Sequence, residues 1–279
     1  MGHLDAMVAD MRLRGLRPAT IKNYRYEVGA VQRHFGDRSL ASLTREELRE
    51  YLLGLKAKGL SAGGIRLRVF ALRFFYRETL GLLELAAQIP IPRRSRHTPM
   101  AMTREEVARL LAVTRRPRYR AMFMLMYGAG LRVGEACRLK TTDIDSDRML
   151  LTIDPSKGGG ARFAMLSPRL LQELRAYWRK LRPTPPYLFP GRTNPQVPVG
   201  RGAAYVAFKK ALAEAGVNSR YTPRSLRHSF ATHLLEGGVD LRVIQTVLGH
   251  RSVLSTEVYT HVSDKLICET TSPLDSLVA

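Results

Sequence analysis

Hydrophobic residues recur at steps of three and four along the first ninety residues, a spacing that places them on one face of a helix. Pro18 suits the first turn of one such helix, and Thr44 with Glu47 forms a capping box before another. Gly59 ends that helix, and a further apolar series runs on to about Leu85. The pattern predicts four short amphipathic helices with brief connections, packed as a small bundle. Their expected core positions are Ile21, Tyr24, Val28, Val31, Leu48, Leu52, Leu55, Ile65, Val69, Leu72 and Phe75.

The helical pattern stops at the stretch Ile89-Pro-Ile-Pro-Arg-Arg-Ser-Arg-His-Thr-Pro. Its prolines cannot continue a helix, and its basic cluster suits a connection that lies along a polyanion. We therefore expect a helical domain over residues 1–88, a linker over 89–100 and a second domain over 101–279.

The second domain mixes helical and strand periodicity. A capping box at Thr103 predicts a helix, the very apolar stretch 118–127 predicts a buried one, and Ser167-Pro168 begins another. Between them, Met149-Leu-Leu-Thr-Ile and Arg162-Phe-Ala-Met-Leu read as two strands of a hairpin with a glycine-rich tip. Later helices are expected at about 168–181, 201–215, 224–236 and 240–248, then a short one carrying Tyr259 and an apolar tail. The fold class is therefore mainly α, a helical N-terminal bundle plus a mixed α+β C-terminal domain with a small β-hairpin or sheet.

The charge of the chain indicates a polyanionic partner. Lys and Arg number 45 against 24 Asp and Glu, a formal charge of +21 that is spread over both domains. Such an excess is typical of proteins that bind nucleic acid. Any single basic residue of the first domain reads as part of a solvated face, but together they suggest a surface that grips a DNA backbone. The residues concerned are Lys22, Arg25, Lys56, Lys58, Arg66, Arg68 and Arg73.

Other classes of protein are not favoured. Cys137 and Cys268 lie far apart without a CxxC partner, so neither a disulfide framework nor a zinc site is indicated. The longest apolar run, 121–131, is too short to span a bilayer, and the N-terminus lacks a signal-peptide pattern. The glycine-rich tip near Lys157 lacks the phosphate-loop spacing, which argues against ATP. We expect a cytoplasmic protein without metal or cofactor.

Several residues have the chemistry to hold or attack a phosphate. Arg224 and Arg227 are three residues apart on a predicted helix, so both should point the same way, opposite the apolar face. Arg132 is expected at a helix N-terminus, where Glu135 would orient it or cap the helix. Lys157 either swings into a site from its glycine-rich tip or is a plain exposed lysine. His250 follows a glycine stop, and Tyr259 follows nine residues later.

These residues resemble the tyrosine site-specific recombinases of the phage-integrase family, including its Xer-type members. The matching pieces are Gly130-Leu-Arg-Val-Gly-Glu, Lys157 in its hairpin, Leu226-Arg-His-Ser-Phe-Ala-Thr-His, Leu248-Gly-His and Tyr259-Thr-His-Val. Their order and spacing match across roughly 100–265. The resemblance implies that the first domain is a core-binding (SAM-like) domain and the second a tyrosine recombinase catalytic domain.

The resemblance also implies roles for the residues. Tyr259 would be the nucleophile that forms a 3′-phosphotyrosyl intermediate, and Lys157 the general acid for the 5′-oxygen. Arg132 and Arg227 would hold the phosphate, and His250 would bond a non-bridging oxygen or help Tyr259 lose its proton. Arg224 stands where the family usually has histidine. Since arginine cannot accept a proton near neutral pH, we expect another phosphate contact from it. His228, His233 and His261 also match family positions, and we expect structural roles for them.

The partners implied are double-stranded DNA and further copies of the chain, four protomers on two DNA sites, built from a dimer at each site. The reaction class is DNA integration, excision, resolution or transposition. The apolar tail, with Leu266, Ile267, Leu274, Leu277 and Val278, would dock on a neighbouring protomer, with packing on its own domain as the alternative. Two other functions remain open from the sequence: a type IB topoisomerase that relaxes supercoils, and a non-catalytic DNA-binding protein.

Overall fold

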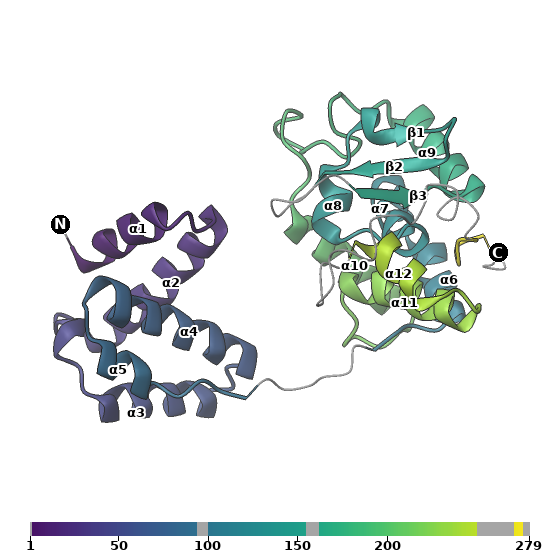
Figure 1. Cartoon of the computed structure of the whole chain (residues 1–279). Coiled ribbons are helices and arrows are strands. Elements are labelled where there is room, and N and C mark those ends of the chain that lie inside the picture. Colours follow the sequence, from purple (N-terminus) through teal and green to yellow (C-terminus); the bar gives the residue numbers. More distant parts are fainter. Residues whose placement is uncertain (1, 94–99, 155–161, 250–270, 276–279) are drawn as a thin grey trace. The chain divides into compact units, whose positions relative to one another are not determined.

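The computed structural model describes residues 2–93, 100–154, 162–249 and 271–275 of the chain. The chain divides into two compact units, Met1–His97 and Thr98–Ala279, whose elements are labelled in Figure 1. Among the described residues, no helix combines the length and apolar character that a membrane crossing requires.

The N-terminal unit is entirely helical in its described residues, as predicted. Five α-helices form, one more than expected, because a short helix follows the turn at Gly81. The capping box at Thr44 is present with both hydrogen bonds, and Pro18 is the first residue of its helix. The helices are α1 His3–Leu13, α2 Pro18–Phe35, α3 Arg45–Ala57, α4 Ala62–Phe74 and α5 Leu83–Gln88, with a 3-10 turn, η1 Leu40–Ser42, and a π-helical turn, η2 Phe75–Thr79.

One member of the predicted basic surface lies in the core of this unit. Arg68 is buried on α4, and its Nε donates to Glu27 Oε2 at 2.6 Å. Its Nη1 donates to the Tyr51 hydroxyl at 2.7 Å. The prediction of a surface role for Arg68 is therefore wrong, because helical spacing alone does not show which polar side chain turns inward to meet a buried carboxylate.

Two further arginines of α4 hold the chain where it leaves the helical bundle. Arg73 Nη1 donates to the carbonyl of Ile89 at 3.2 Å, and Arg66 Nη1 to that of Pro92 at 2.7 Å. Ile89 is almost fully buried. The first residues of the predicted linker thus pack on the N-terminal unit, and these two guanidinium groups are engaged with their own chain.

The C-terminal unit combines helices with a small antiparallel sheet of strand order β1-β2-β3. The predicted hairpin is confirmed, since β2 and β3 pair from Leu150 with Met165 to Ile153 with Arg162. The sequence did not predict β1, which is only two residues long. The elements are α6 Arg104–Val113, α7 Pro117–Gly128, α8 Val133–Arg138, η3 Thr141–Asp143, β1 Ile144–Asp145, β2 Leu150–Ile153, β3 Arg162–Met165, α9 Pro168–Leu181, α10 Arg201–Glu214, α11 Pro223–Glu236 and α12 Leu241–Leu248.

Helix α7 forms the centre of this unit, as its apolar sequence predicted. Every residue from 121 to 128 is buried, and the helix packs against α9 and α11. The turn after it is crowded. Gly130 has φ +64°, and a Cβ there would lie 2.7 Å from the ring of Phe230. The turn therefore requires glycine, and it brings α11 close to the start of α8.

The described part of the C-terminal tail packs on its own unit. Leu274 is fully buried in the core, and Ser272 Oγ donates to the carbonyl of Gly128 at 2.7 Å. Arg169 Nη1 on α9 donates to the carbonyl of Leu274 at 2.9 Å. Residues 271–275 therefore pack in cis in this structure, the alternative that the sequence left open. The other apolar tail residues, Leu266, Ile267, Leu277 and Val278, lie outside the described residues.

Candidate active site

The predicted site residues divide into two groups. Arg132, Arg224 and Arg227 are described, and they come from the turn after α7 and from α11. Lys157, His250 and Tyr259 lie outside the described residues. The geometry of the site is therefore that of the arginines and of the groups that hold them.

Arg132 is the N-cap of α8, the position predicted for it. Glu135 plays both of the roles considered for it. Its Oε2 accepts from the Arg132 backbone N–H at 2.8 Å, and its Oε1 accepts from Arg132 Nη1 at 2.7 Å. The carboxylate is nearly buried, whereas the Arg132 side chain is 45% exposed. Arg132 is thus anchored through its backbone N–H and through Nη1, while its side chain remains exposed enough to meet a ligand.

Arg227 is buried, with only 8% of its side chain exposed. Nη1 donates to the carbonyl of Gly130 at 2.5 Å, and Nη2 to that of Leu248 at 2.6 Å. Nη1 also lies 3.8 Å from Glu135 Oε2. Arg227 therefore joins the turn after α7, the end of α12 and the carboxylate that holds Arg132.

Arg224 differs from Arg227 although both lie on α11. It is exposed, and in the part of the chain that the structure describes it makes no hydrogen bond or ion pair. The sequence predicted that both arginines point the same way, opposite the apolar face, but it did not predict that Arg224 is exposed while Arg227 is buried. The positive charge of Arg224 nevertheless acts on Arg227 and contributes to lowering its pKa.

A further arginine reaches the same carboxylate, and no pattern in the sequence predicted it. Arg162 begins β3, and its Nη2 donates to Glu135 Oε2 at 2.8 Å. Its Nη1 donates to the carbonyl of Val247 on α12 at 2.8 Å. The only signal was its place a few residues after Lys157, and an arginine in a hairpin strand is ordinarily a surface residue.

The site carries an excess of positive charge in the described residues. Arg132, Arg162 and Arg227 surround the single carboxylate of Glu135. Burial acts to raise the pKa of Glu135, but Arg162 first and then Arg132 outweigh it and leave that pKa lowered. Burial, then Arg132 and Arg162, lower the pKa of Arg227 to about 9. Positive groups that repel each other this strongly favour an anion such as a phosphate between or beside them.

The described histidines and cysteine do not add chemistry here. His233 Nδ1 forms a buried hydrogen bond of 2.9 Å with the hydroxyl of Tyr127, which agrees with its predicted structural role. Cys137 is free and buried, and burial raises the pKa of its thiol to about 11, so it is a poor nucleophile. Among the described residues, no group of His, Cys, Asp and Glu could hold a metal ion.

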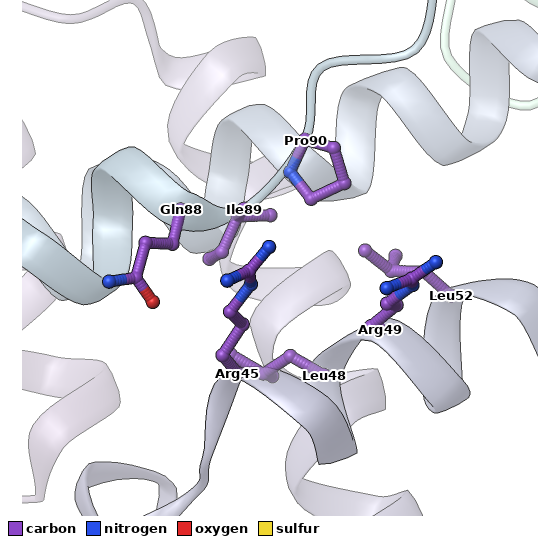
Figure 2. Close-up of a pocket in the computed structure, with 7 residues that line it drawn as sticks. All are labelled: Arg45, Leu48, Arg49, Leu52, Gln88, Ile89 and Pro90. Atoms are coloured by element: carbon purple, nitrogen blue, oxygen red, sulfur yellow. The ribbon is translucent and has the colours of Figure 1, made fainter.

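The N-terminal unit has a second basic feature, a pocket of about 290 Å³ between α3 and the chain after α5 (Figure 2). Arg45 extends from α3 toward Ile89, and Arg49 lines the pocket one turn further along α3, with Leu48 and Leu52 as apolar lining. In the described part of the chain, neither guanidinium group has a hydrogen bond or ion pair, and no acidic residue lines the pocket.

Comparison with known proteins places this arrangement in context. A model of the phage integrase family matches residues 100–265, and one of the phage integrase N-terminal SAM-like domain matches residues 4–83. The putative integrase/recombinase y4qK of Sinorhizobium fredii is 39% identical over 273 residues, 97% of this chain and 88% of that protein. The tyrosine recombinase XerA of Thermococcus kodakarensis is 39% identical over 254 residues, 90% of this chain and 87% of that protein. A solved lambda integrase tetramer bound to a Holliday junction has the same fold, with TM-score 0.73 and 20% identity over 96% of this chain and 76% of that one.

Proposed function

Because the chain belongs to the phage integrase family and is a tyrosine-type site-specific DNA recombinase, we propose that it cleaves and rejoins double-stranded DNA through Tyr259. The observation that carries the residue assignment is the cluster of three arginines around Glu135, with Arg132 open to solvent. A cluster with more cations than carboxylates, one of them exposed, suits a phosphodiester in the transition state.

The reaction is a balanced exchange of phosphate esters. The Tyr259 oxygen attacks the phosphorus, its proton leaves, and the bond from phosphorus to the 5′-oxygen breaks. Lys157 gives a proton to that 5′-oxygen, leaving a 3′-phosphotyrosyl enzyme and a 5′-hydroxyl. Attack by a 5′-hydroxyl of another strand reverses the step. No bond energy is lost in the intermediate, so ATP is not needed.

The two arginines act on the phosphate in different ways, because Arg132 is exposed and Arg227 is buried. Arg132 contacts the non-bridging phosphate oxygens directly, since its side chain is the exposed one of the buried cluster. Arg227 is fixed by two carbonyl groups and supplies positive charge from beneath the phosphate. Charge that is fixed before the reaction needs no reorganisation when the transition state forms, which is why such groups accelerate phosphoryl transfer.

Family members usually have a histidine at the position of Arg224. In this chain, Arg224 takes over its phosphate contact and His250 takes over its proton transfer. Arg224 is exposed beside Arg227 and adds a phosphate contact, because its guanidinium group can donate hydrogen bonds but not accept a proton. His250 is left as the group that assists the Tyr259 hydroxyl. It follows Gly249 directly, and Gly249 ends the helix whose last carbonyl Arg227 holds.

We propose four protomers on two DNA sites as the active assembly. Recombination of two duplexes requires all four strands to be cleaved and rejoined, and each protomer has one tyrosine at the nucleophile position. Residues 271–275 do not carry this proposal, because they pack on their own unit.

The pocket of Arg45 and Arg49 is the part of the N-terminal unit best suited to grip DNA. The basic surface predicted from the sequence is reduced, because Arg68 is buried and Arg66 and Arg73 hold their own chain. Arg45 and Arg49 are open, one helical turn apart, and next to the apolar lining. Two guanidinium groups at this spacing suit two phosphates, and the apolar lining suits the deoxyribose between them.

The test of the function is trapping of a covalent complex on a nicked duplex whose cleaved fragment diffuses away. The unmodified chain should form a protein–DNA adduct, and Tyr259→Phe should bind the DNA equally well but form none. Tyr205→Phe is the matched control, since Tyr205 is an exposed tyrosine of α10 outside the site, and its adduct should persist. An adduct with Tyr259→Phe would refute the nucleophile. Supercoil relaxation without any recombinant product would instead identify a topoisomerase.

A further inference from the structure

The end of α12 is held by two arginines at successive carbonyl groups. The last carbonyls of a helix have no partner within it, and cations are favourable at that end. Arg162 Nη1 donates to the carbonyl of Val247, and Arg227 Nη2 to that of Leu248. Both guanidinium groups also reach Glu135, at 2.8 Å and 3.8 Å. The end of the helix is therefore tied to the carboxylate that anchors Arg132.

Gly249 follows these two carbonyl groups and packs closely against the Arg162 side chain. Gly249 ends the helix in a left-handed conformation with φ +60°. A Cβ on Gly249 would clash with Cδ of Arg162 and would lie 2.8 Å from its Nε. The Arg162 side chain thus constrains the last turn of α12 and Gly249, the residue that precedes His250 in the sequence.

Arg162 is not arranged for greatest stability. Among the described residues, its Nε is the buried side-chain atom without a hydrogen-bond partner. Leaving a buried donor unsatisfied costs about 1–3 kcal/mol. An aliphatic side chain would fill this place without that cost, but it could not join Glu135 to α12. The unpaired Nε and the link to two elements together indicate that Arg162 holds the end of α12 in a fixed position relative to Glu135.

We infer that Arg162 is a positioning residue of the cleavage reaction, which sets the end of α12 against Glu135 and so fixes where the chain to His250 and Tyr259 begins. This inference rests on the proposed function. We expect Arg162 to affect the attack by Tyr259 and not the protonation of the leaving 5′-oxygen, although it lies in the strand that follows the proposed acid, Lys157. It does not contact DNA, because its guanidinium group is directed to Glu135 and Val247.

The experiment compares single-turnover cleavage by the full chain and by Arg162→Met on the nicked duplex. We expect the cleavage rate to fall by about 10- to 100-fold, because small misplacement of a reacting group has effects of that order. The dissociation constant for DNA should change by less than about twofold, since the substitution leaves the groups that face phosphate in place. Arg162→Lys should have an intermediate rate, because lysine can replace one of the two contacts but not bridge both.

Arg120→Met is the matched control. Arg120 also bridges a carbonyl, that of Leu111, and a carboxylate, that of Glu173, within the same unit but on α6, α7 and α9. It should lose thermal stability without losing cleavage rate. An equal fall in cleavage for Arg120→Met and Arg162→Met would overturn the inference. If Arg162→Met fails to fold by circular dichroism, Arg162→Lys carries the same comparison.

A second substrate separates the nucleophile side from the leaving-group side. Sulfur in place of the bridging 5′-oxygen leaves as a thiolate and does not need an acid, since thiols have pKa values near 8.5. It should restore cleavage to Lys157→Ala but not to Arg162→Met. Restoration of Arg162→Met, or cleavage by it at the unmodified rate, would overturn the inference while leaving the recombinase intact. Failure of the unmodified chain to form any adduct would instead contradict the proposed function.

Discussion

Two arginines are buried among the described residues, one in each unit, and their surroundings differ. Arg68 and Arg227 are 8% and 7% exposed. Arg68 faces one carboxylate, Glu27, and the Tyr51 hydroxyl, so its charge is balanced within hydrogen-bond distance. Arg227 shares Glu135 with two other arginines and otherwise donates to backbone carbonyl groups.

These two surroundings distinguish a structural arginine from a functional one. Burial alone does not distinguish Arg68 from Arg227, because both residues are buried to the same extent. The balance between positive and negative groups around each arginine does distinguish them. A neutral pair in the core needs no ligand, whereas three cations around one carboxylate are relieved by an anion from outside. The positive surplus is thus the sign of a site in the C-terminal unit, and its absence marks Arg68 as part of the scaffold.

The largest expected effect is on the stability of the N-terminal unit. Arg68→Met leaves the largely buried carboxylate of Glu27 without its partner, which should lower the free energy of unfolding by about 3–5 kcal/mol in urea titrations. Adding Glu27→Leu should recover most of that loss, since apolar residues can replace a buried ion pair at little cost. If the double variant is as unstable as the single one, Arg68 has a role beyond charge balance.

The next effect is on catalysis in the C-terminal unit. Arg227→Ala should slow covalent adduct formation by about 10²- to 10³-fold, the effect of removing one fixed donor from a developing charge. DNA affinity in a binding titration should change little. A large loss of affinity with an unchanged rate of cleavage by the bound enzyme would show Arg227 to be only an anchor for DNA.

A smaller effect is expected from Glu135→Gln, which keeps the shape of the carboxyl group and removes its charge. The free energy of unfolding should fall by about 1–3 kcal/mol at neutral pH. Because the folded pKa of Glu135 is lowered, its contribution is present above the unfolded value near 4.3 and is lost as pH falls through the folded pKa. Melting temperatures of Glu135→Gln should therefore depend less on pH below 5 than those of the unmodified chain. Parallel curves for the two proteins would contradict this linkage.

The smallest effect is on the salt dependence of DNA affinity. It compares basic groups of the N-terminal unit that are free with basic groups that are ion-paired. Arg45→Gln with Arg49→Gln should reduce the slope of log affinity against log salt by about 1.8, that is about 0.9 for each phosphate that is no longer neutralised. The control removes the same charge from arginines that are already ion-paired, Arg14 with Glu78 and Arg38 with Glu47. Equal slopes for the two double variants would mean that only net charge matters.

Local signals in the sequence predicted the scaffold well. The capping boxes at Thr44 and Thr103, the buried helix α7 and the hairpin of β2 and β3 all depend on neighbours within a few residues. Arg132 could also be placed, because its helix begins at the next residue and Glu135 is one turn away.

The contacts that build the site could not be predicted in the same way. Arg162 bonds to a carboxylate 27 positions away and to a carbonyl 85 positions away. The burial of Arg227 depends on the turn at Gly130 and on the end of α12, which helical spacing does not describe. Leu274 reaches the core from the last residues of the chain. Long-range contacts of this kind follow from the tertiary fold, so the motif predicted candidate residues but not the contacts that hold them.

The turn from Gly128 to Gly130 anchors both ends of the segment that carries Tyr259 in the sequence. Its first carbonyl holds Ser272, and its last carbonyl holds Arg227, which in turn holds Leu248. The chain therefore leaves and returns at the same short turn, and Tyr259 lies eleven positions after Leu248 and thirteen before Ser272. Closing a loop of this length costs about 3 kcal/mol of chain entropy, and a short tether keeps a group at roughly millimolar concentration near its anchor. On the proposed assignment of Tyr259 as the nucleophile, this covalent connection would keep the tyrosine available to the arginines next to the turn, whatever the concentration of protein in solution.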